Sequence, residues 1–198
     1  MGSNGVARGK KNADKIGATI VFIDESGFLM APLVRRTWAP RGQTPMLYHR
    51  TRHRQKVSAI AALCWKQGEP VRLYFRLHPD KNINTRLFVA FLRQLFRHVE
   101  GPLVMVWDRL NVHRSPRVRG YVETRHGSRI VFLPAYAPEL NPVEYLWGNW
   151  KMNQLVNLGV DTLEELVSAV RKPAFRTQRK RRLLSSLIRH SPLSFCLK

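Results

Sequence analysis

Three acidic residues lie at positions where the surrounding chain is expected to be rigid. Asp24 and Asp108 each directly follow a continuous apolar run, and Glu144 lies three residues after Asn141 at the expected beginning of a helix. Carboxylates brought together repel one another unless something positive lies between them. Hard oxygen ligands of this kind select Mg²⁺ or Mn²⁺. The set therefore predicts a site for a divalent metal ion.

The two apolar runs, residues 18–23 and 102–107, are expected to be the strands that position the aspartates. Both are rich in β-branched residues without polar alternation, which is typical of strands buried on both faces. A charged residue that ends such a strand lies at the edge of the sheet, where ligands usually bind. Glu25 follows Asp24, and strand alternation is expected to send its side chain to the opposite face.

Glu144 has two possible roles. Pro142 suits the first position of a helix and Asn141 suits its N-cap. Asn-x-x-Glu is also the spacing of a capping box, in which the glutamate bonds the N-cap N–H, and an acid there interacts favourably with the helix dipole. The segment alone favours the capping role, and the two upstream aspartates favour a catalytic one.

The remaining pattern predicts further strands and helices. The expected strands are 33–38, 57–65 and 71–77, the last at an edge, and the apolar spacing over 84–99 predicts a helix with one buried face. Trp147 and Trp150 are expected to be core anchors rather than platforms for stacked bases.

The charge balance points to a polyanionic partner. Lys and Arg number 34 against 13 acids, for a net charge of +21 and a pI near 11.3, and nucleic acid is the usual partner of such an excess. A membrane surface is the competing partner, but it leaves the strand-end aspartates unexplained. Arg35, Arg36 and Arg41 are candidate phosphate contacts that could equally be solvated surface groups. In the run 49–56, which contains no acid, phosphate contact is favoured for Arg50, Arg52, Arg54 and Lys56, and Arg114 is a further candidate.

The two cysteines, Cys64 and Cys196, have no metal-ligand or disulfide-framework spacing. They argue against zinc and fit a reducing cytosol. No apolar run reaches the length of a membrane span, so no membrane partner is expected.

Four motifs in order resemble one family. They are Asp24-Glu25-Ser26-Gly27-Phe28, the segment 38–45 (WAPRGQTP), the segment 107–113 (WDRLNVH) and the segment 138–144 (PELNPVE). Over residues 15–170 the chain resembles the catalytic domain of bacterial insertion-sequence transposases related to mariner elements. Asp108 and Glu144 are 36 positions apart, close to that family's spacing of its second aspartate and final acid.

The resemblance implies an α/β fold of the ribonuclease-H-like type, a mixed sheet flanked by helices. It also implies a DDE active site of Asp24, Asp108 and Glu144, which would use two Mg²⁺ or Mn²⁺ ions to cut transposon ends and join them to target DNA. It implies double-stranded DNA as partner, a homodimer on DNA, and possibly a separately encoded helix-turn-helix module. His113 matches a histidine common after the second aspartate. Its alternatives are a general base, a DNA contact or a hydrogen-bonding scaffold, with Asn111 as a further supporting residue.

The expected organisation is a basic arm over residues 1–16, a catalytic domain over 17–172 and a basic extension over 173–198, which would be a solvated helix or a clamp on the DNA backbone. The expected location is the cytoplasm, associated with the nucleoid. Two other functions stay open: an inactive or partner-dependent DNA-binding fragment lacking the helix-turn-helix module, and a structure-selective host nuclease.

Overall fold

The computed structural model describes residues 17–31, 33–44, 46 and 55–193. Its strands are β1 (Thr19–Leu29), β2 (Lys56–Trp65), β3 (Arg72–Pro79), β4 (Leu103–Trp107) and β5 (Arg129–Phe132). Its helical segments are α2 (Thr85–His98), α3 (Asn111–Arg114), α4 (Pro116–Glu123), η1 (Pro138–Leu140), α5 (Pro142–Asn149), η2 (Trp150–Gln154), α6 (Leu163–Gln178) and α7 (Arg181–His190). The two longest predicted segments outside the site, the strand 57–65 and the helix 84–99, are confirmed to within a residue at each end.

The five strands form one mixed sheet in the order β3-β2-β1-β4-β5. β1 is antiparallel to β2 and β2 to β3, whereas β1, β4 and β5 are parallel. The antiparallel strands follow one another along the chain. The parallel neighbours are joined by longer crossovers, as parallel pairing requires: β2, β3 and α2 lie between β1 and β4, and α3 and α4 lie between β4 and β5. The expected edge position of the strand at 71–77 is confirmed, because β3 is a terminal strand.

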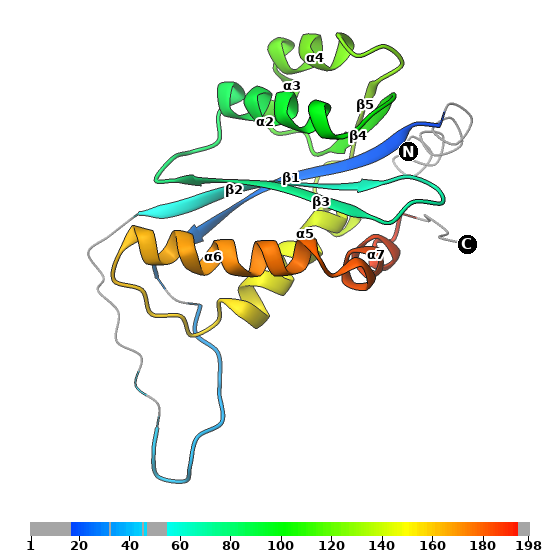
Figure 1. Ribbon diagram of the computed structural model, residues 1–198. Coiled ribbons are helices and arrows are strands. Elements are labelled where there is room, and N and C mark those ends of the chain that lie inside the picture. Colours follow the sequence, from blue (N-terminus) through cyan, green and yellow to red (C-terminus); the bar gives the residue numbers. More distant parts are fainter. Residues whose placement is uncertain (1–16, 32, 45, 47–54, 194–198) are drawn as a thin grey trace.

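Helices cover both faces of the sheet (Figure 1). One face packs α2 and α4 against the side chains of Val21, Ile23 and Met105. The other packs α5, α6 and α7 against Ile20 and Phe22. β1 therefore alternates between two apolar cores, which is why its sequence reads as continuously apolar.

Two expected strands differ from the structure. β1 does not end before Asp24 but continues to Leu29, because β2 extends the antiparallel ladder through Asp24↔Ala61 and beyond. The strand expected over 33–38 does not form. Only Leu33 bridges Val156, and residues 34–44 are exposed and without regular structure.

The C-terminal helices pack on the same core as the sheet. α6 continues without a break through the boundary expected at residue 172, and Pro173, Ala174 and Thr177 in its second half are buried. α7 buries Leu184, Leu187 and Ile188. The described part of the chain contains no helix long and apolar enough to cross a membrane.

Candidate active site

Asp24 lies where β1 has lost one of its neighbours. The parallel pairing with β4 ends at Phe22↔Val106, whereas the pairing with β2 continues on the other side. The Asp24 carboxylate is therefore beside the point at which β4 ends and Asp108 begins. Its side chain is 7 % exposed, and its Oδ2 accepts a hydrogen bond of 2.7 Å from the indole Nε1 of Trp147.

Asn141 joins the helix of Glu144 to the strand of Asp24. Its Oδ1 accepts from the N–H of Val143, which makes it the N-cap of α5, and its Nδ2 donates to the carbonyl oxygen of Ile23 at 3.0 Å. Because Ile23 immediately precedes Asp24, one buried side chain fixes the helix bearing the third acid against the strand bearing the first. The predicted N-cap at Asn141 and first helical position at Pro142 are confirmed.

Glu144 does not complete a capping box. The N–H of Asn141, which a capping glutamate would bond, donates instead to the carbonyl oxygen of Pro138 at 2.8 Å. The carboxylate makes no hydrogen bond to any group in the described part of the chain, and the side chain is exposed on the first turn of α5. Its location in the first turn is therefore compatible with binding something outside the helix.

Asp108 is held by the segment that follows it. Its Oδ1 accepts from the N–H of Leu110 at 3.0 Å and contacts Nδ1 of His113 at 2.6 Å. The other ring nitrogen of His113, Nε2, lies 2.9 Å from Oε1 of Glu25. Because both nitrogens meet carboxylate oxygens, which only accept, the ring is an imidazolium. The expected separation of Asp24 and Glu25 onto opposite faces of β1 is confirmed, and Glu25 reaches the site through His113.

The three carboxylates line one cavity of about 460 Å³. Asn141, Arg109 and the turn 133–138 complete its wall. The geometry thus brings together the three acids that the sequence singled out, from β1, from the end of β4 and from α5.

Burial and the repulsion between like charges change the pKa values of the acids in the site. Burial, followed by the charges of Glu144 and Glu25, raises the pKa of Asp24 from 3.8 to about 8, although the hydrogen bond from Trp147 opposes the shift. Burial also raises the pKa of Glu144. The positive charge of Lys151 opposes this shift, and the negative charge of Asp108 adds to it. Burial alone would raise the pKa of Asp108, but the hydrogen bonds from His113 and Leu110 hold it below its usual value.

The histidine carries the compensating positive charge on one side of the site. Burial acts to lower the pKa of His113, but its hydrogen bonds to Asp108 and Glu25 prevail and raise that pKa to about 9. That charge offsets Asp108 and Glu25 but not Asp24, whose pKa stays high. An added cation beside Asp24 would relieve the remaining repulsion.

The donor set fits a hard divalent cation in its chemistry. Oδ1 of Asp24 and Oδ2 of Asp108 have no hydrogen bond within the described part of the chain, and both residues line the cavity together with Glu144. Among the described residues, no three His, Cys, Asp or Glu side chains are grouped closely enough to hold an ion. The carboxylates would therefore have to draw closer together on binding one.

A lysine follows Glu144 by seven positions, in the segment η2 directly after α5. η2 is a π-helical turn, closed by the N–H of Leu155 bonding the carbonyl oxygen of Trp150, and such turns often occur at functional sites. Lys151 in this turn donates to Oγ of Ser26 at 2.7 Å, and its ammonium lies 5.4 Å from the centre of the Phe28 ring. A β1 side chain therefore holds this cation near the acids.

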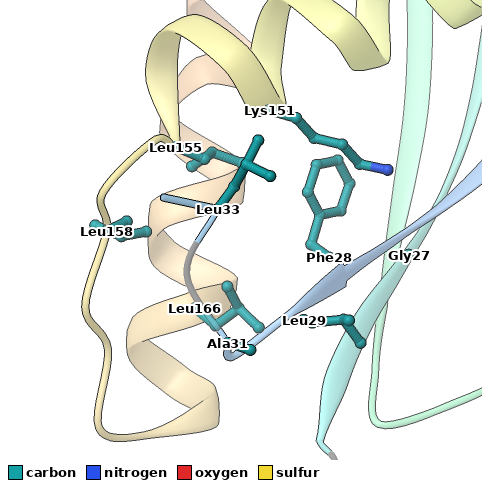
Figure 2. Close-up of a pocket in the computed structure, with 9 residues that line it drawn as sticks. All are labelled: Gly27, Phe28, Leu29, Ala31, Leu33, Lys151, Leu155, Leu158 and Leu166. Carbon is teal, nitrogen blue, oxygen red and sulfur yellow. The ribbon is translucent and has the colours of Figure 1, made fainter. Parts of the chain in front are cut away.

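A second cavity, of about 360 Å³, lies beside Lys151. Figure 2 shows that leucines from three segments surround it, with the lysine side chain extending past the Phe28 ring. The lining residues are Gly27, Phe28, Leu29, Ala31, Leu33, Lys151, Leu155, Leu158 and Leu166. Because it contains no carboxylate, it is not a candidate for metal-dependent chemistry.

The basic residues expected to contact phosphate have different environments. Arg36, Arg41 and Arg114 are exposed. Arg35 is bonded to the protein itself, through Nη1 to the carbonyl oxygen of Met152 at 3.0 Å, and Nζ of Lys56 is hydrogen-bonded to Oδ1 of Asn82. Arg50, Arg52 and Arg54 lie outside the described residues, as do the 1–16 arm and the end of the C-terminal extension.

The hydrogen bond from Trp147 to Asp24 was not predicted from the sequence. Trp147 was expected to be a core anchor, and it is buried, but it also donates to Asp24. Asn111 was expected to support the site, but its side chain is exposed at the beginning of α3 and makes no hydrogen bond within the described residues. The spacing of the sequence did contain one signal for the contact between Trp147 and Asp24. Glu144 and Trp147 lie three residues apart and therefore share a face of α5, which places Trp147 on the side of the helix that carries the acid.

The five-stranded mixed sheet with helices on both faces, together with carboxylates on β1, after β4 and on a following helix, defines a ribonuclease-H-like domain. A family model described as DDE superfamily endonuclease matches residues 19–167. Because this match covers more than half of the chain, the protein belongs to the DDE superfamily of endonucleases.

Solved structures of mariner Mos1 transposase share the fold. A Mos1 paired-end complex with Mn has a TM-score of 0.65 at 18% identity, over 98% of this chain and 60% of that one. A paired-end complex with Mg has a TM-score of 0.63 at 19% identity, over 98% of this chain and 59% of that one. The Mos1 catalytic domain alone has a TM-score of 0.56 at 16% identity, over 95% and 87%. A search of curated proteins gave no match.

This chain thus spans about three fifths of the length of the Mos1 chains in the paired-end complexes. It covers most of the separate catalytic domain. The likeness therefore concerns the catalytic fold.

Proposed function

We propose that this chain is the catalytic domain of a DNA transposase that cleaves DNA at transposon ends and transfers the strand into target DNA. The observation that carries the proposal is the convergence of Asp24, Asp108 and Glu144 on one cavity. These are the positions that the family resemblance assigns to the DDE acids. The family match and the shared fold support the same assignment.

The three acids have distinct tasks in this proposal. Asp24 would hold a metal ion through Oδ1, because the indole of Trp147 engages Oδ2. Asp108 would hold a metal ion through Oδ2, because His113 and the N–H of Leu110 occupy Oδ1. Glu144, exposed on α5 and without an intramolecular hydrogen bond within the described residues, is free to complete the ligand set and orient the attacking oxygen.

Two bound Mg²⁺ or Mn²⁺ ions would supply activation of the attacking oxygen and stabilisation of the charge on the reacting phosphate. In cleavage, a water oxygen attacks phosphorus and the bond to the leaving DNA oxygen breaks. In strand transfer, the 3′-hydroxyl of the cut end attacks instead, so each P–O bond formed matches one broken. No side chain of the protein becomes covalently attached to DNA.

Double-stranded DNA is the proposed partner. The net charge of +21 supplies affinity that is independent of sequence and falls steeply with salt. The exposed Arg36, Arg41 and Arg114 are the described candidates for phosphate contact. We expect a homodimer on DNA, with a helix-turn-helix module for end recognition possibly encoded separately, and a cytoplasmic location associated with the nucleoid.

The test is nicking of supercoiled plasmid by the purified chain in Mg²⁺ or Mn²⁺, compared with Glu144→Gln. This variant keeps the size of the side chain and removes its charge at an exposed position, so its melting temperature should match that of the parent. Metal-dependent nicking by the parent alone would support catalysis by Glu144. Equal nicking by both would refute the assignment of Glu144.

The second candidate function is a DNA-binding fragment that is inactive or acts only with a partner. The charge favours DNA binding independently of the acids. Salt-sensitive DNA binding without any metal-dependent nicking by the parent protein would select this function.

A further inference from the structure

His113 lies between the carboxylates of Glu25, on β1, and Asp108, directly after β4. Its side chain is 0 % exposed, its Nδ1 is 2.6 Å from Oδ1 of Asp108, and its Nε2 is 2.9 Å from Oε1 of Glu25. Glu25 comes from β1 and Asp108 follows β4, so the imidazole ties together the two strands whose ends form the site. Oε2 of Glu25 is buried without a hydrogen bond within the described residues. The bond from Oε1 to His113 is therefore the one hydrogen bond that this carboxylate makes within the described residues.

Aromatic rings fix the plane of this imidazole. The Trp107 ring is stacked on it at 5.4 Å between centroids, with 27° between the planes. The Phe88 ring lies 4.8 Å away at 49°. Both rings are themselves fully buried. His113 therefore has no room to rotate without displacing two core aromatics.

This environment excludes the two direct roles considered for His113. A general base must reach the proton that it accepts, and a DNA contact must reach the surface. His113 does neither, because its side chain is fully buried and both of its nitrogens are occupied by carboxylates.

We propose that Glu25 and His113 are positioning residues that set the orientation of the Asp108 carboxylate. His113, together with the N–H of Leu110, takes Oδ1 and leaves Oδ2 as the oxygen available to a metal ion. Glu25 in turn holds the far side of the imidazole. The inference rests on the proposed function, because it assigns the purpose of the arrangement to metal binding by Asp108.

The two ring nitrogens can be tested separately with amides of different length. In His113→Asn the shorter amide nitrogen stands near the place of Nδ1, so the bond to Asp108 can persist while that to Glu25 is lost. In His113→Gln the longer amide nitrogen stands near Nε2, so the bond to Glu25 can persist while that to Asp108 is lost. Glu25→Gln keeps an oxygen that can accept from Nε2.

The readout is Mn²⁺ binding by the full chain, followed as loss of the free-ion electron paramagnetic resonance signal, alongside the Mn²⁺ concentration for half-maximal nicking. Losing a partner of a metal ligand typically weakens metal binding or activity about 10- to 100-fold. We expect weakening of this size in His113→Gln and a clearly smaller effect in His113→Asn and Glu25→Gln.

His78→Asn is the matched control. His78 is also buried, 6 % exposed, but on β3 and with Nε2 lacking a hydrogen bond within the described residues. A change confined to packing would lower the melting temperature of the His78 and His113 variants without changing Mn²⁺ affinity below the melting temperature.

The outcomes separate the inference from the proposed function. If the parent chain neither binds Mn²⁺ nor nicks DNA, the proposed function fails. If the parent does both, and His113→Gln binds Mn²⁺ as tightly as the parent or no more weakly than His113→Asn, the positioning role is refuted while the proposed function stands.

Discussion

Replacing Trp147 by Phe would remove the N–H that bonds Asp24 while keeping a smaller aromatic ring in the core. The indole Nε1 donates to Oδ2 of Asp24 at 2.7 Å, and this is the carboxylate's one hydrogen bond within the described residues. The bond stabilises the ionised carboxylate and so lowers the pKa of Asp24, against the burial that raises it to about 8. Its loss must therefore raise that pKa further.

The size of the effect follows from the energy of the bond. A hydrogen bond to a charged group contributes about 1.5–3 kcal/mol, and one pKa unit corresponds to about 1.4 kcal/mol. The pH at which Asp24 ionises should thus rise by roughly one to two units. At metal concentrations well below saturation, where metal binding must displace the proton of Asp24, the ionised fraction at pH 7 falls tenfold per unit of pKa. The nicking rate under those conditions should therefore fall roughly 10- to 100-fold and recover at alkaline pH or at saturating metal.

The assay is the rate of metal-dependent plasmid nicking as a function of pH. The neighbouring Trp150 provides a matched control, because its ring lies 5.3 Å from that of Trp147 and its Nε1 donates to Oγ1 of Thr177 at 3.0 Å. Trp150→Phe removes the same atoms from the same core, but its lost hydrogen bond does not involve an acid. It should lower the melting temperature and leave the pH profile unchanged.

The reasoning is wrong if the two variants behave alike. Equal loss of rate at every pH in both would mean that the indoles act only through packing. An unchanged pH profile in Trp147→Phe, with the rate retained, would mean that the indole does not control ionisation of Asp24.

Three further predictions concern other parts of the molecule. With chelator present, raising the pH from 5 to 8 should lower the melting temperature. The reason is that the folded chain holds a proton on Asp24 (pKa about 8, against 3.8 in the unfolded chain), and this proton must dissociate on unfolding. Calorimetry should show a smaller decline in Asp24→Asn, and added Mn²⁺ should restore the melting temperature of the parent. Asn141→Ala should cost about 2 kcal/mol in urea unfolding, about one for the helix cap and one for the bond to the strand, and an unchanged unfolding midpoint would contradict the link between α5 and β1. Replacing Arg36 and Arg41 together by Ala should reduce the slope of log binding constant against log salt by up to about 1.8 if both contact phosphate, as measured by fluorescence anisotropy with duplex DNA, and an unchanged slope would exclude both.

Much of the framework follows from local sequence alone. The apolar run before Asp24 predicts a strand because only a strand buried on both faces has no polar alternation. Asn141 and Pro142 predict where α5 begins, because their preferences for the N-cap and the first turn depend on the backbone itself. The apolar spacing of 84–99 predicts α2 for the same kind of local reason.

Other features depended on partners far along the chain. The expected end of β1 at residue 23 was wrong by six residues, because pairing with β2, whose partner residues lie 27 to 35 positions further along the chain, continues past Asp24 to Leu29. The expected strand at 33–38 did not form, because no neighbour continues its pairing beyond the bridge from Leu33 to Val156. The sequence of one segment alone does not determine which other segment it pairs with or how far the pairing extends.

The sequence by itself determined which acids to examine, since residue type and local context marked Asp24, Asp108 and Glu144. Only the tertiary structure decided that they share a cavity, and which of their oxygens are already engaged. It also decided that Glu144 is not a cap and that Glu25 reaches the site through His113. The physical reason is that hydrogen-bond partners of buried polar groups are fixed by distance and angle in the folded state, which bring together side chains as far apart in sequence as Asp24 and Trp147.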